Sequence, residues 1–103
     1  VIETQVKKQN KKQKTEAVIT VVGHDRVGII AAVSKLLAEQ GVNINDISQT
    51  ILQDVFTMIM LVDLSGIKSD IKLLADELEQ LGKELEISIR IQHADIFDAM
   101  HRI

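Results

Sequence analysis

The spacing of hydrophobic positions changes several times along the chain, and each change marks a new element. Residues 17–23 form a β-branched run that ends in a glycine, which is typical of a strand. Apolar side chains then recur every three or four positions over residues 29–40, which predicts a helix, and Gly41 stands where a helix commonly ends. Two further strands are predicted over 42–52 and 55–64, joined by a tight turn.

The predicted strand over 42–52 changes the parity of its apolar residues midway. Because Ile44 and Ile47 fall on opposite parities, we expect a β-bulge or kink near Asn45–Asp46. The strand over 55–64 is apolar on both parities, which predicts that both of its faces are covered.

The second half of the chain adds one more helix and one more strand. Ser69 is expected to cap a helix over 71–85, and Asp70 is favourable near the helix N-terminus. Residues 86–92 alternate between apolar and polar side chains, as a half-buried strand does. A short amphipathic helix is predicted over 94–103.

The predicted element order is therefore β-α-β-β-α-β with a short C-terminal helix. This order is the α+β, ferredoxin-like sandwich. Right-handed crossovers place the two main helices on one face of an antiparallel sheet. We expect the strand order 4-1-3-2, because the first and third strands are the most apolar and should be central.

The charge is distributed unevenly between two parts of the chain. Residues 1–16 hold five lysines and two glutamates, whereas residues 17–103 hold 7 basic and 13 acidic residues. The first part also lacks a core-forming period, so we interpret it as a flexible basic tail ahead of a single domain over 17–103. A frayed helical extension is the alternative interpretation of this segment.

The composition excludes several classes of function. The absence of cysteine removes disulfides, thiolate metal sites and cysteine nucleophiles. Only Phe56 and Phe97 are aromatic and the net charge is −3, which argues against nucleic-acid binding. No apolar run is long enough to span a bilayer. We therefore expect a cytoplasmic protein that binds no metal, cofactor, nucleic acid or membrane.

The most informative segment is GHDRVG, residues 23–28, which leaves the first strand and opens the first helix. Its two glycines allow close approach of the backbone to a ligand, and the helix N-terminus offers free N–H groups to an anion. Asp25 could receive an ammonium group and Arg26 could hold a carboxylate. The residues alone leave a plainer interpretation open, in which Asp25 only caps the helix and Arg26 is solvated.

The run GHDRVGIIAAVSKLLAEQGVNI resembles the opening of an ACT domain, a small regulatory module that senses amino acids. The segments DISQTI and FTM and the ending IQHADIFDAM resemble more closely the stand-alone bacterial ACT proteins of the UPF0237 group. The resemblance covers residues 17–103. It implies a non-catalytic regulatory domain that forms a homodimer and holds a small molecule, an amino acid, between its subunits.

The resemblance also implies where the ligand binds, namely at the first loop, the start of the first helix and the second strand. Gly28 matches the signature glycine and Asn43 the ligand-contacting asparagine of such domains. The full candidate set is His24, Asp25, Arg26, Val27, Gly28, Asn43, Asn45 and Asp46. Asp25 stands where serine-binding members have asparagine and Val27 where many have proline, which argues against a serine-type site.

Several roles stay open at this point. His24 either responds to the charge of a ligand or is an ordinary loop histidine, and Asn45 and Asp46 either line the cleft or only stabilise the kink. The first loop and the second strand lie at opposite ends of the first helix, so a dimer axis is needed to join them. The alternative functions are a module that binds a partner protein without a small ligand, and an accessory domain separated from its enzyme.

Overall fold

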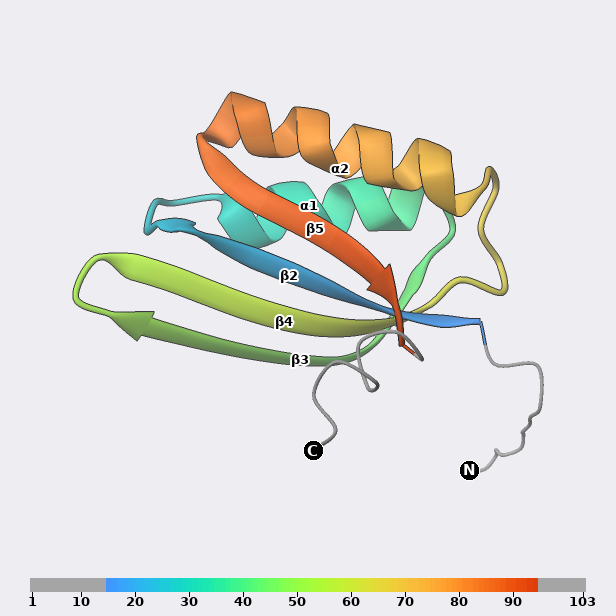
Figure 1. Cartoon of the computed structure of the whole chain (residues 1–103), viewed down its shortest axis with the longest axis horizontal. Helices are drawn as coiled ribbons and strands as arrows, with labels where there is room; N and C mark the ends of the chain where they lie inside the picture. Colours follow the sequence, from blue (N-terminus) through green and yellow to red (C-terminus); the bar gives the residue numbers. More distant parts are fainter. Residues whose placement is uncertain (1–14, 95–103) are drawn as a thin grey trace.

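The computed structural model describes residues 15–94 of the chain. Its elements follow the order β-α-β-β-α-β (Figure 1). They are β2 (Glu16–His24), α1 (Ile29–Glu39), β3 (Asn43–Leu52), β4 (Val55–Asp63), α2 (Ile71–Leu85) and β5 (Ile87–His93). Residues 1–14 of the predicted basic tail over 1–16, and the predicted C-terminal helix beyond Ala94, lie outside the described residues. The predicted tail ends too late, because Glu16 already belongs to β2.

The four strands form one antiparallel sheet with the order β3-β4-β2-β5. Counted along the chain from the β5 edge, this is the order 4-1-3-2, so the predicted ferredoxin-like topology is confirmed. Both helices lie on the same face of the sheet (Figure 1). This arrangement follows from right-handed crossovers, since α1 joins β2 to β3 and α2 joins β4 to β5.

The hydrophobic core lies between the helices and the two central strands. Alternate residues of β2 and β4 point toward the helices and are completely or almost completely buried. They pack against one apolar stripe from each helix. The main contributors are Ala17, Ile19, Val21, Val33, Leu37, Phe56, Met58, Met60, Val62, Leu74 and Leu78. Full burial of one large apolar side chain contributes about 1.5–3 kcal/mol.

The start of α2 corrects one prediction. Asp70, and not Ser69, is the capping residue, and its Oδ1 accepts a hydrogen bond of 2.8 Å from the N–H of Leu73. Ser69 instead donates its hydroxyl to Oε1 of Gln40 at 2.9 Å, which ties the loop to the end of α1. Asp70 takes the role because it stands directly before the helix in extended conformation, within reach of the third helical amide.

The structure confirms one prediction about β3 and contradicts one about β4. The predicted bulge is confirmed by a register shift between Ile44 and Asp46. The prediction that both faces of the 55–64 strand are covered is wrong within one chain. Val55 and Ile59 remain 49% and 42% exposed on the face that points away from the helices, because both helices occupy the opposite face.

A glycine inside α2 allows this helix to lie against the edge of the sheet. Gly82 is buried, and a Cβ placed there would lie 2.7 Å from the carbonyl oxygen of Ile87. Any larger residue would therefore push α2 away from β5. Gly82 thus sets how closely α2 approaches the edge strand.

Candidate ligand site

The loop between β2 and α1 is fixed at one end of the sheet. The backbone N–H of Asp25 donates a 2.9 Å hydrogen bond to the carbonyl of Asp54, which lies in the β3–β4 turn. The loop and the turn therefore lie side by side at the same end of the molecule (Figure 1). All of His24, Asp25, Arg26 and Val27 are exposed there.

The two glycines of this loop have different roles. A Cβ at Gly23 would collide with the side chain of Ile87, so this glycine serves the packing of β5 against β2 and not the approach of a ligand. Gly28 directly precedes α1 with φ = 96°, a left-handed conformation that favours glycine. Nothing lies within 4 Å of a Cβ placed there, so the space above Gly28 is open.

The N-terminus of α1 carries no side-chain cap and no acidic residue in its first turn. The plainer interpretation of Asp25 as the capping residue is therefore wrong, because Gly28 occupies the capping position. The first intrahelical amide bond runs from Ala32 to the carbonyl of Gly28. The preceding amides, starting with Ile29, lie at the positive end of the helix dipole and are suited to an anion.

Arg26 is not simply solvated. Its Nη1 donates a 3.1 Å hydrogen bond to the carbonyl of Leu85, the last residue of α2. A cation at a helix C-terminus is favourable because the dipole is negative there. A guanidinium has five N–H donors, so one bond to Leu85 leaves further donors for a carboxylate.

The second part of the candidate set begins β3. Asn43 donates from Nδ2 to Oδ1 of Asn45 at 2.8 Å, and Asn45 donates in turn to Oε2 of Glu16 at 3.4 Å. Asp46 accepts a 2.8 Å bond from the N–H of Ile47, which follows the bulge. Asp46 therefore stabilises the kink, the plainer of the two roles considered for it.

The two halves of the candidate site lie at opposite ends of the sheet. Asn43 is opposite Asp63, and Asp63 is opposite Glu16 at the start of β2, whereas the loop follows His24 at its end. Eight strand positions of about 3.3 Å separate those ends, roughly 26 Å along the sheet. One chain therefore does not bring Asn43 to the Asp25–Gly28 loop.

Exposed apolar side chains surround the loop and line the neighbouring edge, and only Val27 among them belongs to the predicted candidate set. Val27 is 99% exposed and Ile30 39% exposed at the start of α1. Ile47 and Ile51 are 43% and 52% exposed on the helix-facing side of β3. The signal that could have found them is the parity slip of β3, which keeps two isoleucines on the helix-facing side of an edge strand, where each is about half exposed.

Two other kinds of site find no support in the described part of the chain. No group of three His, Asp or Glu residues could hold a metal ion there. None of the described helices is long and apolar enough to cross a membrane.

Comparison with known proteins agrees with the fold described above. The profile of the ACT domain matches residues 15–92. The chain belongs to the ACT domain family, in its UPF0237 group. A UPF0237 protein of Methanopyrus kandleri is 51% identical over 89 residues, which cover 86% of this chain and 99% of that protein. The sequence resemblance to bacterial members of this group therefore extends to an archaeal one.

Two solved structures extend the comparison. An ACT domain protein from Streptococcus pneumoniae is 48% identical, has a TM-score of 0.72, and is matched over 86% of this chain and 100% of its own. A putative glycine cleavage system transcriptional repressor is 31% identical with a TM-score of 0.68, over 79% of this chain and 46% of its own. The domain is thus found both alone and within a longer protein.

Proposed function

We propose that this ACT domain is a non-catalytic, cytoplasmic sensor that binds a free amino acid at the interface of a homodimer. The observation that carries the proposal is the division of the candidate site between opposite ends of one sheet, beside an uncovered edge strand. The ACT family, and the repressor to which the chain is similar, support a regulatory role. Ligand binding would then favour one arrangement of the dimer or one partner-binding state.

Antiparallel pairing of β3 with its copy would reunite the two halves. A two-fold axis near Ile47 and Ser48 places the start of each β3 beside the end of the other. Asn43 of the partner subunit then lies at the same end as the Asp25 loop. It is separated from the end of β2 by three strand spacings, roughly 14 Å in place of 26 Å. An amino acid and the side chains that hold it can bridge that gap.

The same pairing would also cover apolar surface. Ile47 lies at the proposed axis and Ile51 lies farther along the same edge, and both are about half exposed in one chain. At roughly 25 cal/mol per Å² of apolar area removed from water, their burial favours association. Edge strands with exposed apolar residues that remain unpaired are prone to aggregation, so a defined dimer is also a protection.

The ligand chemistry follows from the groups on each side of the proposed cleft. The free amides at the start of α1 and the remaining donors of Arg26 suit a carboxylate. The carboxylate of Asp25 suits an ammonium group. Asn43 of the partner subunit would contact the side chain of the ligand, and the exposed Val27 would form an apolar wall. A zwitterion satisfies both charges at once.

Thermal unfolding across a panel of the free amino acids tests the function. A ligand specific for the native dimer, present at a hundred times its dissociation constant, stabilises by about 2.7 kcal/mol. For a domain of this size that is a rise in Tm of roughly 10 °C. Sedimentation with and without the stabilising amino acid should show tighter association when it is bound. An unchanged Tm with every amino acid at millimolar concentration would contradict the sensor proposal.

A further inference from the structure

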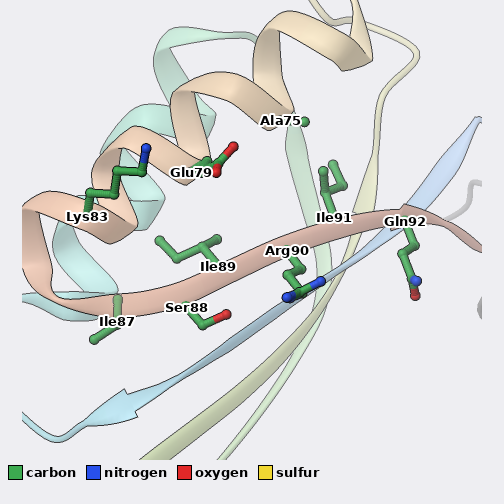
Figure 2. Close-up of a pocket in the computed structure, with 9 residues that line it drawn as sticks. All are labelled: Ala75, Glu79, Lys83, Ile87, Ser88, Ile89, Arg90, Ile91 and Gln92. Carbon is green, nitrogen blue, oxygen red and sulfur yellow. The ribbon is translucent and has the colours of Figure 1, made fainter.

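The other edge of the sheet carries a groove that the proposed amino-acid site does not use. It has a volume of about 500 Å³ and runs between β5 and α2. On the helix side it is lined by Ala75, Glu79 and Lys83, which follow one another at intervals of four residues and so form one stripe of α2. Figure 2 shows this stripe above the strand.

The groove follows both faces of β5. Ile89 and Ile91 point toward α2, whereas Ser88, Arg90 and Gln92 point to the other side of the sheet (Figure 2). The charged ends of Lys83 and Arg90 therefore do not converge on one point. A compact ligand would contact only one side, while an extended chain along the edge would contact both.

The backbone of β5 is also available along this edge. The N–H of Asp25 points toward the β3–β4 turn, on the β4 side of β2. Because the N–H and C=O groups of successive residues in a strand point to alternate sides, the even-numbered residues of β2 direct these groups toward β5. Thr20 is opposite Arg90 in that pairing. Ile89 and Ile91 consequently direct their N–H and C=O groups outward, and within residues 15–94 no strand pairs with β5 on that side.

The positive charge of Arg90 at the middle of β5 indicates which kind of strand can pair with this edge. Arg90 is the central residue of β5, is exposed, and makes no ion pair within residues 15–94. Pairing of β5 with its own copy about a two-fold axis would place Arg90 directly opposite Arg90, which is unfavourable. A strand with an acidic residue at that position would pair favourably. Its two neighbouring residues would point toward Ile89, Ile91 and the methyl group of Ala75.

We propose that the β5 edge binds an extended segment of a partner protein, by strand addition, and that this segment carries an acidic residue between two apolar residues. Main-chain hydrogen bonds to Ile89 and Ile91 would supply affinity, and Arg90 would favour segments with an acidic residue at the opposite position. Lys83 gives the groove a second cation, and Glu79 is the single acidic side chain that lines it. The inference is independent of the amino-acid site, because none of the residues that line this groove belongs to the proposed amino-acid site.

The probe for the test is the blocked pentapeptide Ser-Val-Glu-Val-Ser, and its matched control replaces Glu by Lys. NMR titration of the full chain should show the amides of Ile89 and Ile91 responding to the glutamate peptide. We expect it to bind about fivefold more tightly than the lysine peptide, the size of a cross-strand charge pair. Arg90→Glu, a change at an exposed position, should reverse the preference.

Backbone methylation of the peptide separates strand addition from ordinary surface contact. A peptide N-methylated on the amides that face β5 should lose binding. A peptide N-methylated on the amides that face away from β5 should bind as the unmodified peptide does. Equal binding of both methylated peptides, responses confined to β3, or no response at millimolar peptide would overturn the proposal. So would a response at Arg90 to free amino acids that competes with the peptide, which would make this edge a small-molecule site.

Discussion

The two edges of the sheet differ in what stands at their centres. The middle of β3 holds Ile47 and Ser48, which are uncharged, and the neighbouring Asp46 accepts a hydrogen bond from the N–H of Ile47 at the bulge. The middle of β5 is Arg90, and α2 lies along that edge. A two-fold axis places a residue near its own copy, so an edge centred on uncharged residues can pair with itself while an edge centred on arginine repels itself. This difference supports both proposals, that β3 forms the dimer interface and that β5 binds a different partner.

The largest effect is expected from a charge placed at the centre of β3. Ile47→Lys removes apolar surface and brings two lysines together at the proposed axis. Because symmetry applies the change twice, we expect a loss of about 3 kcal/mol of association free energy, or roughly a hundredfold in the dimer dissociation constant. Ile47 is 43% exposed, so the protomer should remain folded. Sedimentation equilibrium measures the change.

The matched control for the dimer lies on the other edge. Arg90→Ser also alters an exposed residue at the centre of an edge strand, and it should leave the dimer dissociation constant unchanged. Weaker association in this control, together with an unaffected Ile47→Lys dimer, would exchange the roles of the two edges.

The next effect concerns the open space above Gly28. Gly28→Val and Gly28→Ala both force a side chain into a conformation with φ = 96°, so each should lower the free energy of unfolding by about 1–2 kcal/mol. Only valine fills the space where backbone and ligand are proposed to meet. Calorimetry with the stabilising amino acid should therefore show binding lost in Gly28→Val and largely kept in Gly28→Ala. Equal affinities in the two variants would argue that no ligand approaches Gly28.

A smaller change tests the contribution of the partner subunit. Asn43→Ala should weaken amino-acid binding by roughly 1–3 kcal/mol, the cost of losing a buried hydrogen bond, and leave the fold intact. Asn45→Ala should have a lesser effect, since Asn45 accepts a hydrogen bond from Asn43 and is not itself proposed to contact the ligand. Unchanged affinity in Asn43→Ala and in Gly28→Val would instead move the site to the face around Ser88, Arg90 and Gln92.

The smallest effect is expected from removal of residues 1–14. Among the described residues the core runs from Ala17 to Ile89, and the sequence of residues 1–14 is polar and has no core-forming period. Deletion should shift Tm by less than about 2 °C, as is usual for a polar terminus. A larger loss, measured by differential scanning calorimetry, would show that the segment packs on one of the two edges.

The sequence by itself determined the order of the elements and the fold class. Hydrophobic periodicity is a local property, and it located the helices, the strands and the bulge near Asn45–Asp46 because each depends on side chains a few positions apart. The apolar character of β2 and β4 was enough to place them at the centre of the sheet. The candidate residues were found by resemblance, since loop spacing alone left Asp25 and Arg26 with plainer roles.

Only the tertiary structure decided what each candidate residue contacts. Gly23 accommodates Ile87, and Arg26 bonds the end of α2, because segments some 60 positions apart meet there. The distance between the Asp25 loop and Asn43 likewise depends on the strand register and not on their separation in sequence. The contrast between the edges has the same origin. Which strand is left at an edge, and which helix lies beside it, is fixed by crossovers between distant segments, and no local pattern contains that information.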